Sequence, residues 1–451
     1  MGDAATTVVT RRRVLAGGGA AAGWALLAAC AGAQPGTGES GGAPARQPAT
    51  LRFKYRIPSD VVRQSYDRAL EVWRTEHPEI VLEPEANDSA TFTPSLTSQI
   101  AAGTPPDAAP ADWDQSLDWA SDGLLLPLDD LLKARRVNPD EWFQGAMDYT
   151  RLGGKAYGLP ITGYTTVVYY NRDLFQREGV PLPPKDGSWR WRDLEALAVR
   201  LTRRDPSDPQ ASRWGLIPSS AVSGGLASAV WQNGGSLTDV RESPEKMTID
   251  QPAAVEAIAW LTDLSLKHRV GPTAEERRAL GKDPFVMGRV AMLWGGMPLF
   301  FNTMFQITDF TWDLVPGPRG PSGTQGAATQ TNAFAIFKGT KHADQAFTLI
   351  YFFTAGAGVR VRAEIQQVAV AHKRALQEVW MKAQPAVNRQ ALIDSQPYTR
   401  DVYKGRLCSQ WIAAVQGAVD RAVNGEISPK AAADAAAAQG AVVLADARRR
   451  S

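Results

Sequence analysis

Apolar positions along the first part of the chain follow two spacings, one typical of buried strands and one typical of amphipathic helices. A mixed apolar run predicts a strand at 51–57, and apolar side chains three and four residues apart predict a helix at 61–77. A second strand is expected at 80–84 and a second helix at 95–102, before a turn and a short third strand. This β-α-β-α-β order predicts a parallel sheet covered by helices.

The same alternation continues toward the end of the chain. Further strands are expected at 166–171, 214–218, 289–294, 313–316 and 331–337, and further helices at 191–204, 253–267, 342–354 and 408–424. No fixed-period repeat interrupts this pattern, and 451 residues at about 150 per domain indicate two or three domains. The sequence therefore predicts an α/β protein of more than one lobe.

The first thirty residues carry a pattern typical of export. A charge-free stretch at 14–29 follows Arg11, Arg12 and Arg13. This stretch is too short for a membrane-spanning helix, and its glycines make it too weakly apolar. The paired arginines resemble a twin-arginine signal, and the Leu-Ala-Ala-Cys run that ends at Cys30 resembles a bacterial lipobox. We expect 1–29 to be an export signal and Cys30 to carry lipid; an ordinary secretory signal with an accidental cysteine is the alternative.

A tether is expected to follow the signal. Residues 30–49 are mostly Gly, Ala, Pro, Ser and Gln, a composition that buries too little surface to fold. Lipid on Cys30 would hold the folded body at the outer face of the cytoplasmic membrane, or on the periplasmic side in a two-membrane organism. Cys408 is then the one remaining thiol, which excludes an internal disulfide and is more typical of packed core than of a nucleophile.

Charge and motif content exclude several classes of function. The chain has 49 basic and 47 acidic residues, and the expected export signal contains three arginines and Asp3. The remaining chain would be neutral, and it would lack the positive electrostatic field that is typical of a nucleic-acid-binding protein. The four histidines are dispersed, and neither a metal-binding nor a nucleotide-binding motif stands between a strand and a helix. Asp112 and Asp114 could form a glycosidase pair, but neighbouring acids on one loop more often accept hydroxyls. We expect no catalytic residue, no metal and no cofactor.

Several short phrases resemble one family when they are taken in order. They are GGKAYGLP at 153–160, YYNRDLF at 169–175, a Pro- and Trp-containing element at 183–197 that lacks the usual threonine, FVMGRVAM at 285–292 and GEISP at 425–429. Behind a lipobox and a tether, this series resembles the bacterial extracellular solute-binding proteins that feed ABC importers, and within them the carbohydrate-binding group.

The resemblance implies a two-lobed periplasmic-binding-protein fold of type II, with a ligand cleft between lobes joined by hinge segments. The first lobe would hold 50–162 and 331–366, and the second lobe 163–330 and 367–451. The connecting segments would lie near 161–165, 328–332 and 366–370.

A sugar presents an apolar ring face and a rim of hydroxyls, so its site needs aromatic rings beside groups that donate and accept hydrogen bonds. The 14 tryptophans could supply such rings. Matching to the family suggests the following substrate-binding residues: Trp411, Trp294, Trp113, Asp112, Asp114, Tyr164 and Trp231. The loop at 219–225 departs from the pattern, because it has neither a carboxylate nor an aromatic ring where some sugar binders place a polar clamp.

The function implied by the resemblance is capture of a mono- or oligosaccharide and its delivery to the transmembrane permease of an ABC importer. We expect a monomer, held at the membrane by its N-terminal lipid. A binder of a non-sugar solute, such as a polyamine, a peptide or an organic phosphate, is the alternative. A glycoside-acting enzyme is the weaker competitor.

Overall fold

A computed structural model describes residues 49–112, 115–205, 207–295, 304, 307–329, 331–383 and 387–450. The expected export signal, Cys30 and the tether lie outside these residues, except that Ala49 is the first residue of strand β1. Trp113 and Asp114 also lie outside them.

The first of two main sheets has the strand order β2-β1-β3-β12-β6. β1 (Ala49–Arg56) pairs in parallel with β2 (Ile80–Asn87) and with β3 (Ala108–Ala111). β12 (Ala333–Ile336) runs antiparallel to β3 and to β6 (Leu159–Pro160). The predicted β-α-β-α-β start is confirmed, and the return of β12 brings residues far apart in sequence into one sheet.

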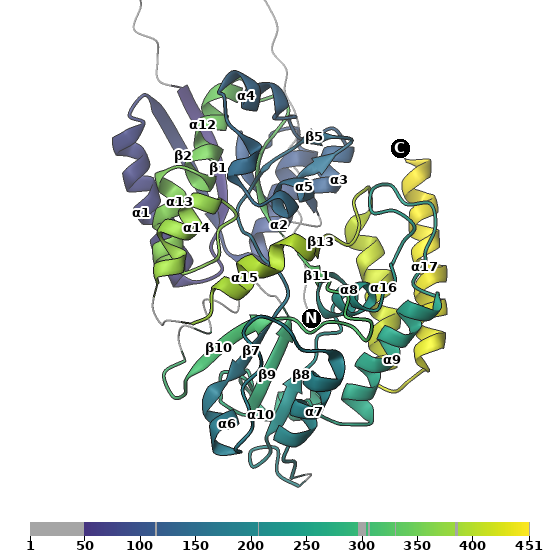
Figure 1. Cartoon of the computed structure of the whole chain (residues 1–451). Coiled ribbons are helices and arrows are strands. Elements are labelled where there is room, and N and C mark those ends of the chain that lie inside the picture. Colours follow the sequence, from purple (N-terminus) through teal and green to yellow (C-terminus); the bar gives the residue numbers. More distant parts are fainter. Residues whose placement is uncertain are drawn as a thin grey trace, which may run out of the picture. The chain divides into compact units, whose positions relative to one another are not determined.

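Helices α1, α12 and α13 cover this sheet (Figure 1). α1 (Asp60–Glu76) begins where the Ser59 hydroxyl caps it, and its buried face matches the predicted stripe, ending in a fully buried Trp73. α12 (Ala343–Thr354) and α13 (Ala357–Gln366) pack against each other and around α1 and β12. We call these elements, with α2 (Ser89–Ala101), the first lobe.

The second main sheet has the order β10-β7-β9-β8. β7 (Val167–Asn171) lies antiparallel between β10 (Trp312–Pro316) and β9 (Val290–Gly295), and β8 (Trp214–Ile217) runs parallel to β9. Every residue of β7, β9 and β10 is buried, because elements pack on both faces of this sheet.

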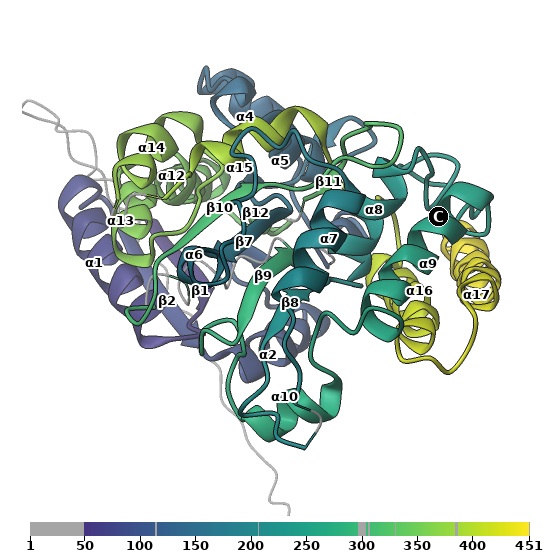
Figure 2. The ribbon, with the colours of Figure 1, turned by 60° about the horizontal axis from the view of Figure 1, so that its bottom comes forward.

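The helices of this second lobe gather beside its sheet (Figure 2). α7 (Trp191–Leu201) packs on β8, and α9 (Pro252–Leu266) packs on α16 (Cys408–Val423) and α17 (Pro429–Arg449). α17 was not predicted, because its buried side is built from alanines and glycine with Leu444 as its one large apolar member.

The remaining elements are short. They are α3 (Gln115–Ser121), α4 (Asp129–Ala134), α5 (Gln144–Tyr149), β4 (Arg151–Leu152), β5 (Lys155–Ala156), α6 (Arg172–Arg177), α8 (Ala227–Gln232), α10 (Ala274–Leu280), β11 (Ala327–Ala328), α14 (Lys373–Glu378), α15 (Gln390–Ser395) and β13 (Thr399–Arg400), with single turns of tighter or wider helix at Pro139–Glu141, Val222–Leu226, Trp380–Lys382 and Gln396–Tyr398. α14 packs on α13 of the first lobe, whereas α15 packs on β10 of the second. The lobe boundaries expected from the sequence stay a prediction.

Candidate functional site

The chain passes between the two sheets at three places. It leaves β6 of the first sheet and enters β7 of the second, returns from β10 to β12, and finally runs from α13 to α16. The first and last of these connections lie side by side, since the amide of Gly163 donates to the carbonyl of Ala369 over 3.1 Å. Segments that link two lobes in this way are suited to act as a hinge.

Two buried threonines tie the second connection to the first. The Thr331 hydroxyl donates to the carbonyl oxygen of Thr162, and the Thr329 hydroxyl donates to that of Tyr164, each over 2.6 Å. Both threonine side chains are buried. These two side-chain hydroxyls therefore provide hydrogen bonds for carbonyl oxygens that do not take part in the regular hydrogen bonds of a β-sheet.

Polar side chains meet at the carboxyl ends of the first-sheet strands. Arg56 ends β1 and forms an ion pair with Asp112, which follows β3. The Arg56 guanidinium also lies over the ring of Phe92, 4.7 Å from its centroid. Asn87 ends β2 beside Arg56, and its Oδ1 is buried without a hydrogen-bond partner among the described residues. This edge thus offers a positioned carboxylate and an unused amide oxygen, both acceptors for hydroxyl groups.

The loop after β8 lies at the corresponding edge of the second sheet. Gln416 of α16 holds the loop after β8, because its Oε1 accepts from the Val222 amide over 2.8 Å and its Nε2 donates to the Ser220 carbonyl over 3.2 Å. The same Nε2 donates to Asp420 over 2.7 Å. The predicted lack of a charged clamp within this loop is therefore offset by polar side chains that α16 brings to it.

Helix α16 also reaches the first lobe. The Cys408 amide donates to Oδ1 of Asp118 on α3 over 3.2 Å. Arg406, just before α16, donates to the Ser121 carbonyl over 2.7 Å and pairs with Asp122 at 2.5 Å. Since α3 follows the loop of Asp112, α16 joins the polar edges of both lobes.

The tryptophan at the end of β9 lies inside the second lobe. Trp294 is 0% exposed and meets Trp260 edge to face at 5.5 Å, and Trp260 in turn stacks on Trp191 at 4.0 Å. The Trp294 indole nitrogen is buried without a partner among the described residues. No face of this ring is open to a ligand in this structure, so a binding role would require movement of the surrounding helices.

The other predicted aromatic residues are buried as well. Trp411 is 0% exposed, packs against Tyr403 at 5.3 Å and donates its indole N–H to the sulfur of Met247 over 3.2 Å. Trp231 and Tyr164 are 5% and 8% exposed, and burial raises the pKa of the Tyr164 phenol. Of the predicted set, Asp112 lies at an accessible edge, whereas the four described aromatics do not share one surface; their contact with ligand stays a prediction.

Several polar residues of these edges were missed by the sequence reasoning. Arg56 is the last residue of a strand, and a charge at the carboxyl end of a strand is the signal that could have found it. Gln416 and Asp420 lie one turn apart on α16 and are both partly buried, but nothing in the sequence indicates that Gln416 holds the loop at 219–225.

Two searches of the described residues give negative results. Within them no group of three or more His, Cys, Asp or Glu side chains is placed to hold a metal ion. None of the helices built from them has the length and apolar character needed to cross a membrane.

Comparison with known proteins identifies the fold and the family. The sequence model described as bacterial extracellular solute-binding protein matches residues 60–358. A lipoprotein of Streptomyces antibioticus, described as uncharacterized and encoded in the oleD 5′ region, is 28% identical over 343 residues, which cover 72% of this chain and 70% of the relative.

Two solved structures are similar over most of both chains. An ABC substrate-binding protein from Listeria monocytogenes in complex with cycloalternan has a TM-score of 0.76 at 23% identity, covering 88% of this chain and 99% of the other. An ABC transporter solute-binding protein from Thermotoga lettingae bound with α-D-tagatose has a TM-score of 0.72 at 19% identity, covering 88% and 100%. The predicted two-lobed fold is confirmed by these likenesses.

Proposed function

The chain belongs to the bacterial extracellular solute-binding proteins, and we propose on that premise that it captures a carbohydrate between its two lobes and delivers it to the permease of an ABC importer. The family consists of proteins that bind solutes and are not enzymes. The structurally similar proteins bound with cycloalternan and with tagatose support a sugar as the solute.

The observation that carries this proposal is the pairing of a hinge with two polar edges. Three segments connect the lobes, and hydrogen bonds tie them together. Arg56 and Asp112 lie on one edge, and the loop held by Gln416 lies on the other. A ligand that accepts from one edge and donates to the other favours the closed form because it binds that form better.

The chemistry at the first edge suits sugar hydroxyls. The Arg56 guanidinium fixes the Asp112 carboxylate but leaves part of its acceptor capacity unused. Two neighbouring sugar hydroxyls can donate to such a carboxylate, and charge-assisted hydrogen bonds of this kind are stronger than neutral ones. We place Trp113 and Asp114 of the same loop in the site, with Trp411, Trp294, Tyr164 and Trp231 as contacts that require exposure of their rings.

Delivery completes the proposed role. Lipid on Cys30 would keep a monomeric binding protein at the membrane, and the tether would raise its effective concentration near the permease. The similarity to a Streptomyces lipoprotein supports such an anchor.

The test is ligand-dependent melting of the full chain against mono-, di- and oligosaccharides, polyamines, short peptides and organic phosphates. A ligand at 100 times its dissociation constant adds about 2.7 kcal/mol, and for about 400 folded residues this raises the melting temperature by about 3 °C. A shift with one sugar class supports the proposal. A shift with a polyamine, a peptide or an organic phosphate in place of any sugar refutes the carbohydrate assignment.

Two matched variants locate the site. Asp112→Asn keeps the shape but removes the charge, and we expect it to weaken sugar binding at least about tenfold in calorimetry. Asp67→Asn makes the same change on the exposed side of α1 and should leave affinity unchanged. Equal affinities of the two variants would contradict a role for Asp112.

A further inference from the structure

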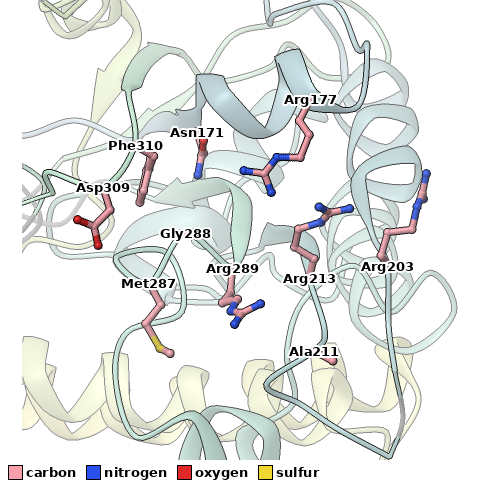
Figure 3. A pocket seen from close by; sticks show the side chains of 10 residues that line it. All are labelled: Asn171, Arg177, Arg203, Ala211, Arg213, Met287, Gly288, Arg289, Asp309 and Phe310. Atoms are coloured by element: carbon pink, nitrogen blue, oxygen red, sulfur yellow. The ribbon is translucent and has the colours of Figure 1, made fainter.

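A cavity lies at the end of the second sheet that is opposite the hinge. It has a volume of about 460 Å³, and its lining includes Asn171, Arg177, Arg213, Arg289, Met287 and Phe310 (Figure 3). These residues stand where β7 ends and where β8, β9 and β10 begin. Cavities of roughly 300–1,000 Å³ hold small-molecule ligands in proteins, so this one is large enough for more than a simple ion.

The cavity carries a surplus of positive charge. Its lining holds four arginines, the fourth being Arg203, against one carboxylate, that of Asp309. Glu178, beside the cavity, pairs with Arg203 and Arg213, so Arg177 and Arg289 face Asp309 alone and leave a surplus of one positive charge. Figure 3 shows the guanidinium groups of Arg177 and Arg213 directed toward each other, whereas those of Arg289 and Arg203 point in other directions.

The arginines differ in how they are held. Glu178 accepts from Arg213 over 2.6 Å and from Arg203 over 3.4 Å, so these two are positioned by an acid of the protein itself. The guanidinium groups of Arg177 and Arg289 have no hydrogen-bond or ion-pair partner within the part of the chain that the structure describes. Two guanidinium groups that line one cavity without ion-pair partners of their own favour an anion as its occupant.

A buried amide provides an independent indication of a ligand. Asn171 is 2% exposed; its Oδ1 accepts from the Leu174 amide over 3.0 Å, whereas its Nδ2 has no partner among the described residues. The Asn171 amide group points into the cavity (Figure 3). The residue is almost wholly buried, so this amide reaches solvent only through the cavity, where an anionic oxygen could accept from it.

Met287 and Phe310 are the large apolar residues of the lining, and a glycine shapes the turn between them and the arginine at 289. Gly288 has a φ of +68°, and a Cβ there would lie 3.3 Å from the ring of Phe310. The residues on either side of this glycine in the chain, Met287 and Arg289, both line the cavity. The phrases at 169–175 and 285–292 thus meet here, far from the connections between the lobes.

From this arrangement we propose that the cavity is a second binding site, distinct from the sugar site, for the phosphate group of a small anionic ester. Planar guanidinium groups and an amide N–H match phosphate oxygens, while Met287 and Phe310 provide a surface for the esterified carbon skeleton. A soluble phosphate ester and the headgroup of an anionic phospholipid share this chemistry.

The experiment is calorimetric titration of the full chain with glycerol 3-phosphate, with glycerol as the uncharged control, and cosedimentation with vesicles of phosphatidylglycerol or of phosphatidylcholine. We expect Arg289→Ala to weaken binding at least about tenfold, Arg289→Lys to weaken it less, and the Arg177→Ala, Arg289→Ala double variant to abolish it. Arg63→Ala, an exposed arginine of α1, is the matched control and should bind as the wild type does.

The outcomes separate the two sources. Binding of glycerol 3-phosphate that is lost in the double variant supports a soluble ester, and arginine-dependent binding to phosphatidylglycerol vesicles alone supports the headgroup. No binding to either probe, or equal binding by the double variant and the wild type, overturns the proposal. All these variants should retain the melting response to sugar, since the cavity lies away from the hinge.

Discussion

The hinge threonines give the sharpest test of how the connections between the lobes are held. Thr329 and Thr331 are 3% and 1% exposed, and each donates its hydroxyl to a carbonyl of the first connection over 2.6 Å. Valine has nearly the same shape as threonine but cannot donate. Thr329→Val and Thr331→Val therefore remove one hydrogen bond each and leave the carbonyls of Tyr164 and Thr162 without these donors.

The magnitude follows from burial. Leaving a buried acceptor unsatisfied costs about 1–3 kcal/mol, so we expect each single variant to lose about that much unfolding free energy and the double variant to lose about 2–5 kcal/mol. For about 400 folded residues, 1 kcal/mol corresponds to about 1 °C, so the double variant should melt about 2–5 °C lower.

The assay is thermal and denaturant unfolding of the full chain, with Thr348→Val as the control. The Thr348 hydroxyl also donates to a carbonyl, that of Asp344 over 3.0 Å, but on the exposed side of α12, where water replaces it. We expect this control to stay within about 0.5 kcal/mol of the wild type. A double variant as stable as the control would refute the view that these hydroxyls hold the connections together.

Three further predictions test the core and its pH dependence. Trp411→Ala should lower the unfolding free energy by about 3–5 kcal/mol in denaturant titrations, because its indole is fully buried, and a near-wild-type value would contradict that packing. Burial by itself raises the pKa of Glu85, but hydrogen bonds from buried Lys54 and from a glutamine hold that pKa below its usual 4.5. The melting temperature should therefore fall as the pH drops below about 4.5, and it should fall less in Lys54→Met. Burial lowers the pKa of His372 below 6.5 despite its contact with Glu141, so the folded state favours the neutral imidazole. The contribution of His372 to the unfolding free energy is therefore fully present above about pH 6.5 and is lost as the pH falls through the pKa of the folded state. His372→Asn should flatten that part of the melting profile; an unchanged profile would assign it to another group.

The regular helices and strands could be predicted because the spacing of apolar residues along the chain indicates which positions are buried. The face of α1 that includes Tyr66 and Trp73 follows from the three- and four-residue period, and the strand that ends at Arg56 follows from its apolar run. α17 could not be predicted in this way, because alanine packs closely without a strong apolar signal and its partners, α9 and α16, lie far away in sequence.

The candidate site was harder to predict than the fold. Spacing shows that a tryptophan such as Trp294 lies in a strand, but not which face of that strand meets helices and which meets ligand. Trp260, on α9, stacks on Trp191 and meets Trp294 edge to face, so Trp294 belongs to an aromatic cluster, and its contact with a sugar stays a prediction. The position of Asp112 at the edge of the sheet was predictable, because a residue that follows the carboxyl end of a parallel strand lies at that edge whichever face of the strand meets the helices.

The second sheet separates the two proposed binding regions along one strand. β7 begins at Val167, next to the connection that carries Thr165, and ends at Asn171 in the arginine-lined cavity. Five residues of extended chain span about 17 Å, and the strand is buried throughout. A charge change at Arg289 is therefore too far away to alter hydrogen bonds at the hinge directly, so sugar affinity and phosphate affinity should respond to separate sets of variants. If Arg289→Ala changed sugar affinity as strongly as phosphate affinity, β7 would have to transmit a shift between its ends, and the two regions would then act as one coupled site.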